Sequence, residues 1–119
     1  MQKINLAAKL QMFNEFFSPK IVARMNNYKV AVVKIKGDFV WHKHDDTDDL
    51  FLVLKGKLCI QLRGHDDIIL EPGELFVVPK GVEHCPRADE ETHVLLIEPS
   101  GTVNTGNAGG ALTANEETI

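Results

Sequence analysis

The chain has 119 residues and a formal net charge of −4. This length suits one domain and is too short for two. Hydrophobic residues make up 44% of the chain and charged residues 25%, which is typical of a globular protein. Lys and Arg are scattered without a basic run, so no nucleic-acid partner is expected.

The start of the chain, MQKINLAAKLQMF, contains lysines but no apolar run long enough for a signal peptide or a membrane span. The sequence therefore predicts a cytoplasmic protein without a membrane partner. The two cysteines, Cys59 and Cys85, form no CxxC motif. We interpret them as reduced thiols that pack as small apolar side chains.

A helix is predicted over residues 5–17. Its apolar residues recur at the spacing of one helix face: Leu6, Leu10, Phe13 and Phe17. Asn5 can cap the start of this helix, and Pro19 ends the pattern. We therefore assign residues 1–19 to an N-terminal helical segment.

Residues 20–99 are predicted to form a β domain, because segments rich in Val, Ile and Leu alternate with turn residues every eight to twelve positions. The predicted strands are 20–25, 28–36, 39–44, 49–54, 57–63, 66–70, 74–78, 83–86 and 92–98. Lys55-Gly56 suits a two-residue hairpin, and Pro72-Gly73 suits a type II turn. Many short antiparallel strands favour a sandwich or a barrel, and a barrel removes open sheet edges.

Two of these strands differ in their hydrophobic pattern. In residues 57–63 apolar and more polar residues alternate, which predicts one buried face. Residues 51–54, FLVL, show no alternation. They therefore predict a central strand that is covered on both faces.

Two histidines two positions apart form the first candidate functional site. Successive side chains on a strand point to opposite faces, so His42 and His44 project to the same side. A carboxylate from the aspartate-rich stretch 45–49 could return to the same point, and His84 could arrive from a neighbouring strand. Imidazole and carboxylate groups suit Fe, Mn, Ni, Cu or Zn. The histidine pair alone is a weak signal, because such pairs also occur by chance on surfaces.

The order of the motifs resembles that of the cupin family. The family's first motif is a glycine, about five residues, His-x-His, three or four residues, Glu, six residues and a glycine. In this chain the corresponding residues are Gly37, His42, His44, Asp49 and Gly56. The second motif is a glycine, five residues, Pro-x-Gly, two residues, His, three residues and Asn. Here it corresponds to Gly73, Pro79, Gly81, His84 and Ala88.

The resemblance implies an antiparallel double-stranded β-helix, the jelly-roll cupin barrel, with a divalent transition metal inside it. The implied metal ligands are His42, His44, Asp49 and His84. Asp49 departs from the family's Glu and reaches one carbon–carbon bond less far. Asp48 misses the register of the motif by one residue and should face the other way.

The resemblance further implies a small metalloenzyme acting on a small polar metabolite, a sugar or an organic acid. Isomerase, dioxygenase and lyase chemistry all stay open, and no residue stands out as a general base. The closing EPSGTVNTGN resembles the end of cupins labelled mannose-6-phosphate isomerase-like, which is a fold relationship and does not establish a reaction. The alternative is a non-catalytic cupin domain that holds a metal or metabolite in a regulatory or scaffold role.

Other expectations concern the surroundings of this site and the assembly. The candidate apolar wall around the metal consists of Phe39, Phe51, Val53 and Phe76. Trp41 should point away from His42, under the helix or into a dimer contact, and Cys85 should face away from the metal. A half-exposed apolar sheet face predicts a homodimer. Residues 100–119 form a tail that is expected to pack on the barrel or on a partner subunit.

Overall fold

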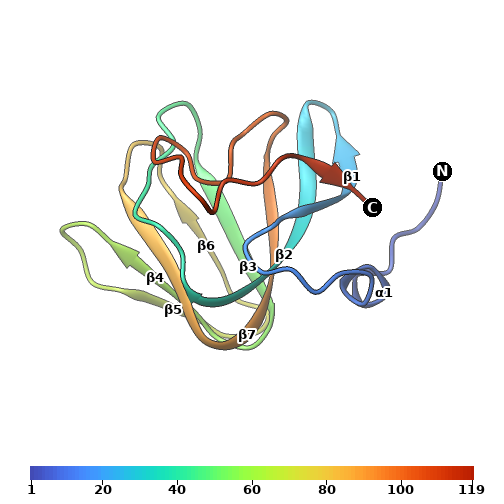
Figure 1. The fold of residues 1–119 in the computed structure, drawn as a ribbon, viewed down its shortest axis with the longest axis horizontal. Helices are drawn as coiled ribbons and strands as arrows, with labels where there is room; N and C mark the ends of the chain where they lie inside the picture. Colours follow the sequence, from blue (N-terminus) through green and yellow to red (C-terminus); the bar gives the residue numbers. More distant parts are fainter.

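The structure of the protein, a computed structural model that describes residues 1–119, consists mainly of β-strands (Figure 1). The elements are α1 (Leu6–Leu10), β1 (Lys20–Met25), β2 (Tyr28–Asp38), β3 (Asp49–Lys55), β4 (Leu58–Leu62), β5 (Ile68–Leu70), β6 (Leu75–Val78), β7 (His84–Pro99) and β8 (Glu117–Thr118). The predicted all-β class with a short N-terminal helix is confirmed. No helix is long and apolar enough to cross a membrane.

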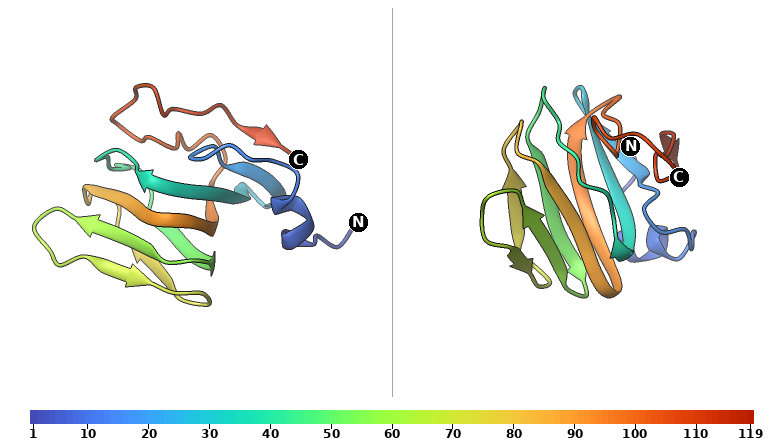
Figure 2. Two further views of the ribbon diagram at one scale, coloured as in Figure 1. Left: turned by 60° about the horizontal axis from the view of Figure 1, so that its bottom comes forward. Right: turned by 60° about the vertical axis from the view of Figure 1, so that its left-hand side comes forward.

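The long strand β7 connects the two sides of the barrel. Its first residues pair with β4, its last residues pair with β3, and β2 runs antiparallel beside it. In Figure 1 it curves along the lower edge of the molecule, and Figure 2 shows the strands on either side of it. The strand order is β5-β4-β7-β2-β1-β8, with β6 joined through β3. One side of the barrel contains β4 and β5, the other contains β3 and β6, and β7 belongs to both.

The sheet is not closed by hydrogen bonds, contrary to the expectation of a barrel without edges. β5 pairs with β4, and β6 pairs with β3, but β5 and β6 do not pair with each other. These two edge strands have only three and four residues. Short edge strands offer little backbone for pairing with another chain.

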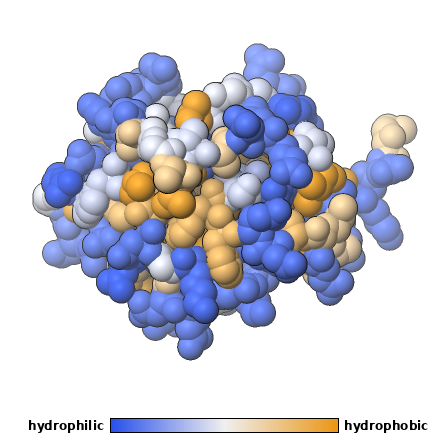
Figure 3. Space-filling model, in the orientation of Figure 1, coloured by the Kyte–Doolittle hydropathy of each residue, from blue (hydrophilic) through white to orange (hydrophobic).

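The interior is filled by the inward rows of the central strands. One cluster contains Val33, Ile35, Phe51, Val53, Leu58, Ile60, Leu70, Val78, Ala88, Val94 and Leu96. In β3 the buried residues alternate with half-buried ones. The prediction that FLVL is covered on both faces is therefore wrong in part. Only Leu54 on its outer face packs against the small cluster formed by α1 and its neighbours. Figure 3 shows that hydrophobic side chains also reach the surface, near the centre of the face viewed there.

The helix α1 is shorter than predicted and ends at Leu10. Asn5 caps it as expected, since its side chain accepts a hydrogen bond from the Ala8 amide. Beyond the helix, Lys34 Nζ donates to the Phe13 carbonyl at 2.7 Å, and the Phe17 amide donates to the Lys34 carbonyl at 2.9 Å. These contacts with β2 replace the bonds that would have continued the helix to residue 17.

Two further predictions about the strands are wrong. Residues 39–44 form no strand, and the backbone of this segment bonds to β7 through the Phe39 amide and a bridge between His42 and His84. The predicted strands 83–86 and 92–98 are one continuous strand, β7. The acidic run between them follows the bend of the strand and does not break it.

Residues 100–119 lie along the barrel (Figure 1). β8 pairs in parallel with β1. Asn104 bonds to the backbone three times: its Nδ2 donates to the carbonyls of Phe17 and Leu112, and its Oδ1 accepts from the Ala114 amide. Hydrogen bonds therefore hold this segment even though its composition is that of a flexible tail.

Candidate metal centre

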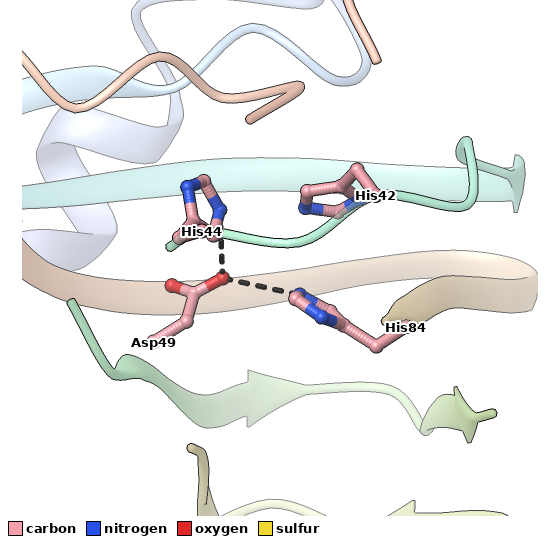
Figure 4. A group of neighbouring side chains, drawn as sticks. All are labelled: His42, His44, Asp49 and His84. Carbon is pink, nitrogen blue, oxygen red and sulfur yellow. Dashed lines mark hydrogen bonds and ion pairs between the residues drawn. The ribbon is translucent and has the colours of Figure 1, made fainter. Parts of the chain in front are cut away.

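Four side chains from three parts of the chain meet inside the barrel (Figure 4). His42 and His44 precede β3, Asp49 begins β3, and His84 begins β7. Their exposed fractions are 2%, 8%, 5% and 1%. Each offers a ligand atom, and these four atoms lie within 4.8 Å of one another. The structure thus brings together all four residues that the sequence singled out.

Backbone pairing fixes the positions of the ligands. The His42 amide donates to the His84 carbonyl at 2.9 Å, and the His84 amide donates to the His42 carbonyl at 2.8 Å. The Gly81 amide donates to the His44 carbonyl at 2.8 Å, which holds the loop. Asp49 lies opposite Val78 in the β3–β6 ladder. The site therefore depends on tertiary pairing of separate segments.

Neighbouring carbonyl groups determine which ring nitrogen of His42 and of His84 carries the hydrogen. His42 Nδ1 lies 2.9 Å from the Val40 carbonyl oxygen, and His84 Nδ1 lies 2.8 Å from that of Val82. A carbonyl oxygen can only accept, so both Nδ1 atoms carry hydrogen. Their Nε2 atoms are then free to bind a metal. A backbone carbonyl commonly orients a metal-binding histidine in this way.

The centre of the cluster suits a cation. His84 Nε2 lies 3.3 Å and His44 Nε2 lies 3.4 Å from Asp49 Oδ2 (Figure 4). Because His84 Nδ1 holds the ring hydrogen, Nε2 and the carboxylate oxygen are two acceptors that face each other. They need a proton or a metal ion between them. Three imidazoles and one carboxylate form a donor set that divalent transition metals accept.

The electrostatics of the group agree with this interpretation. Burial lowers the pKa of His42 to about 4, so its ring is neutral at pH 7. Burial acts to raise the pKa of Asp49, but the hydrogen bonds that protonated His44 and His84 rings would donate to it outweigh burial and lower that pKa to about 2. Burial acts to lower the pKa of His44, and its bond to Asp49 raises it overall. His42 and Asp49 are thus in the forms that bind metal, whereas His44, whose pKa is raised, would release a proton when metal binds.

The neighbouring aspartates lie outside the cluster. Asp48 is exposed, and its Oδ1 accepts a hydrogen bond from the Lys80 amide at 2.9 Å. Asp45 and Asp46 are exposed as well. The one-residue register argument that chose Asp49 over Asp48 agrees with these positions.

A small cavity of about 40 Å³, which opens to solvent, adjoins the cluster. Its lining consists of Phe17, Pro19, Val33, Ile35, Phe39, His42, His44, Asp49, Phe51, Pro86, Leu96, Glu98 and Asn104. The rings of Phe17 and Phe39 stack at 5.2 Å between centroids. Phe39 and Phe51 line the cavity as expected, whereas Val53 and Phe76 pack in the core.

Glu98 is a cavity residue that sequence reasoning missed. It is 3% exposed and lies opposite Lys29 in the β2–β7 ladder, with Lys29 Nζ 3.5 Å from its Oε1. Burial, and then the charge of Asp49, raise the pKa of Glu98 to about 7. The signal was available, because Glu98 continues the inward row of Val94 and Leu96 at the two-residue period of a strand.

Trp41 and Cys85, which stand next to His42 and His84 in the sequence, lie outside the cavity. Trp41 does not pack under the helix; the Arg63 guanidinium lies over its ring at 4.1 Å from the centroid. Cys85 is buried and absent from the cavity lining. It therefore lies apart from the cluster, and both cysteines are free thiols.

An antiparallel barrel with three histidines and an aspartate buried inside it defines a small β-barrel protein that could hold a metal. A family model of the cupin domain matches residues 29–98, and the chain belongs to the cupin family. Cupins bind divalent metals, and the predicted jelly-roll fold is confirmed.

Known proteins agree with this assignment. A cupin-2 domain protein from Shewanella frigidimarina is 48% identical, with a TM-score of 0.79 over 81% of this chain and 93% of that one. The uncharacterized protein YdbB of Bacillus subtilis is 30% identical over 79% of this chain and 83% of its own length. The 3-hydroxyanthranilate 3,4-dioxygenase of Xenopus laevis is 24% identical over 80% of this chain, which spans only 36% of that enzyme.

Proposed function

We propose that this chain is a small metalloenzyme of dioxygenase type. In this proposal His42, His44, Asp49 and His84 hold a divalent transition metal, and the substrate is a small, planar, largely apolar molecule that carries an oxygen donor. The observation that carries the proposal is the direct contact between the four-residue cluster and a cavity with three phenylalanines in its wall.

The lining of the cavity favours an aromatic substrate over a sugar phosphate. Phe17 and Phe39 stack on one side, and Phe51 and Leu96 belong to the same lining. Flat rings pack well against aromatic side chains. The lining contains no Arg or Lys, the residues that usually bind phosphate. The likeness to a dioxygenase that acts on an aromatic ring supports the same reading.

The residues of this chain would orient the substrate and exclude water from the site. A bound metal would supply Lewis-acid polarisation of a substrate oxygen and, if it is iron, a redox centre. Asp49 and the three histidines would fix the position of that oxygen relative to the apolar wall. The stacked rings of Phe17 and Phe39 would hold the ring plane and cover it from solvent.

The test is oxygen uptake by the iron-loaded protein. Protein prepared without a histidine tag is loaded with Fe(II) under anaerobic conditions and mixed with catechol, hydroquinone or 3-hydroxyanthranilate in aerated buffer. We expect uptake with at least one of these compounds and none with the matched His84→Ala protein. Failure of all three compounds, together with interconversion of an aldose and a ketose by the same metal-loaded protein, would replace this proposal with an isomerase.

A further inference from the structure

Glu98 is the one polar group of the cavity that neither the candidate metal centre nor the backbone uses. Three of the five polar lining residues belong to the centre. The fourth, Asn104, directs its amide to the backbone at Phe17, Leu112 and Ala114. The fifth is Glu98, and the structure shows no hydrogen bond to its Oε2.

Glu98 lies next to the metal centre across the sheet. Leu50 of β3 pairs with Ile97 of β7, so the next opposed pair along the two strands is Asp49 and Glu98. Both are buried, on the inward rows of their strands. Directly opposed residues on one face have Cβ atoms about 4.5–5.5 Å apart. Even a small molecule that binds the centre through one atom can therefore reach Glu98 with another.

Stability alone does not explain a buried Glu98. Lys29 lies opposite it as a counter-charge, and Lys29 Nζ also donates to the Thr102 carbonyl at 2.9 Å. A buried ion pair is costly to desolvate, and apolar residues of similar size usually serve as well or better. The pair thus holds a carboxyl group at the cavity wall at a cost in stability, which is the arrangement expected of a ligand-binding group.

We propose that Glu98 is a substrate-positioning residue that accepts a hydrogen bond from a second polar group of the bound molecule. The inference rests on the proposed function and narrows its substrate class. The substrate is then a ring with one oxygen directed to the metal centre and a hydroxyl or amino group directed to Glu98. Lys29 holds the carboxyl group in place and does not itself line the cavity.

The experiment compares ligands that differ by one hydroxyl group. The metal-free protein is loaded with Co(II), and its visible spectrum is titrated with phenol, resorcinol and hydroquinone at pH 8, where Glu98 is ionised. Catechol is left out because its two adjacent oxygens can bind one metal ion. We expect resorcinol or hydroquinone to bind at least about tenfold more tightly than phenol, the range of a hydrogen bond to a charged group. In Lys29→Met/Glu98→Met, which removes the ion pair without leaving a lone charge, this preference should fall below about twofold.

Cobalt content and the melting temperature show whether the double variant is folded and loaded. If the double variant does not fold, Glu98→Gln replaces it. The preference for resorcinol or hydroquinone over phenol should then fall by a factor of at least about three, because a charge-assisted hydrogen bond becomes a neutral one. A preference that survives these substitutions, or equal binding of all three phenols by the unaltered protein, would overturn the role of Glu98. If no phenol perturbs the cobalt spectrum at all, the proposed function itself fails.

Discussion

His42 and His84 exchange both backbone hydrogen bonds, at 2.9 and 2.8 Å, and their ring centroids lie 4.3 Å apart. The bridge joins the segment before β3 to the first residue of β7. Each ring also directs its Nδ1 to the carbonyl oxygen two residues earlier. The backbone therefore sets both the position and the orientation of two proposed ligands before any metal binds, which lowers the entropy cost of binding.

This preorganisation predicts a ranking of metal affinities among single variants. His84→Ala should weaken Co(II) binding most, because it removes a fixed ligand. Asp49→Ala should weaken it less, since three imidazoles remain. Asp48→Ala should change it less than twofold, because this carboxylate lies outside the cluster on the Lys80 amide. Competition with a coloured chelator measures all three, and a larger loss in Asp48→Ala than in Asp49→Ala would mean that the ligand was wrongly chosen.

The buried His42 predicts how the stability of the metal-free protein depends on pH. Its pKa is about 4 in the folded protein and about 6.5 when unfolded. Between these two pH values the unfolded chain binds a proton at His42 and the folded protein does not. The free energy of unfolding therefore falls as pH decreases from about 6.5 to 4. The full effect is about 3 kcal/mol. Urea unfolding at pH 7.0, 5.5 and 4.5 should show a smaller decrease for His42→Gln, and parallel decreases would contradict this role of burial.

The candidate site was predictable from the sequence to the extent that short spacings determine it. His42 and His44 share a face because they lie two residues apart, and the same register rule selects Asp49 over Asp48. His84 comes from a distant strand, so its spacing in the sequence allowed it to reach the site, and the resemblance of the second motif then implied that it is a ligand. Glu98 could have been found by extending the row of Val94 and Leu96, but an alternation that ends in a charged residue is easily taken for the end of a buried strand.

The fold was predictable in class and less so in its boundaries. Leu6, Leu10 and Phe13 keep helical spacing, yet Lys34 of β2 bonds to the Phe13 carbonyl and the helix stops at Leu10. Such a contact joins residues far apart in sequence, so no local pattern contains it. The bend of β7 is similar: its acidic residues 89–91 have the composition of a turn, and the register with β2 shifts there, but β2 pairs with Ala88 before the bend and with Thr92 after it, so the strand continues.

The segment after β7 packs closely against the backbone between His42 and His44, and the closest contact is at Gly106. Gly106 has a φ of +52°, and a Cβ there would collide with the Lys43 carbonyl oxygen and approach the His42 ring. Gly106→Ala should therefore lower both the melting temperature and the Co(II) affinity. Gly109→Ala is the matched control, since its φ is +61° and a Cβ there meets nothing within 4 Å. Both pay about 1 kcal/mol for the left-handed backbone, so equal melting temperatures would show that the close approach has no effect.

The outer face of β3, β6 and the end of β7 predicts a homodimer. It presents a continuous set of apolar side chains, Leu50, Leu52, Leu75, Val77, Leu95 and Ile97, which the strand registers place side by side. Leu75 is 56% exposed and Val77 40% exposed. Soluble monomers rarely leave such a face uncovered, and a twofold axis would let it cover itself.

Sedimentation at tens of micromolar protein should therefore show a dimer. Leu75→Glu should convert it to a monomer, because pairing about the twofold axis would bury two carboxylates without partners. Ile69→Glu is the control, since this side chain is also exposed but lies on β5, away from the apolar face. A dimer that Ile69→Glu disrupts and Leu75→Glu leaves intact would locate the interface elsewhere, and a monomeric unaltered protein would refute the prediction.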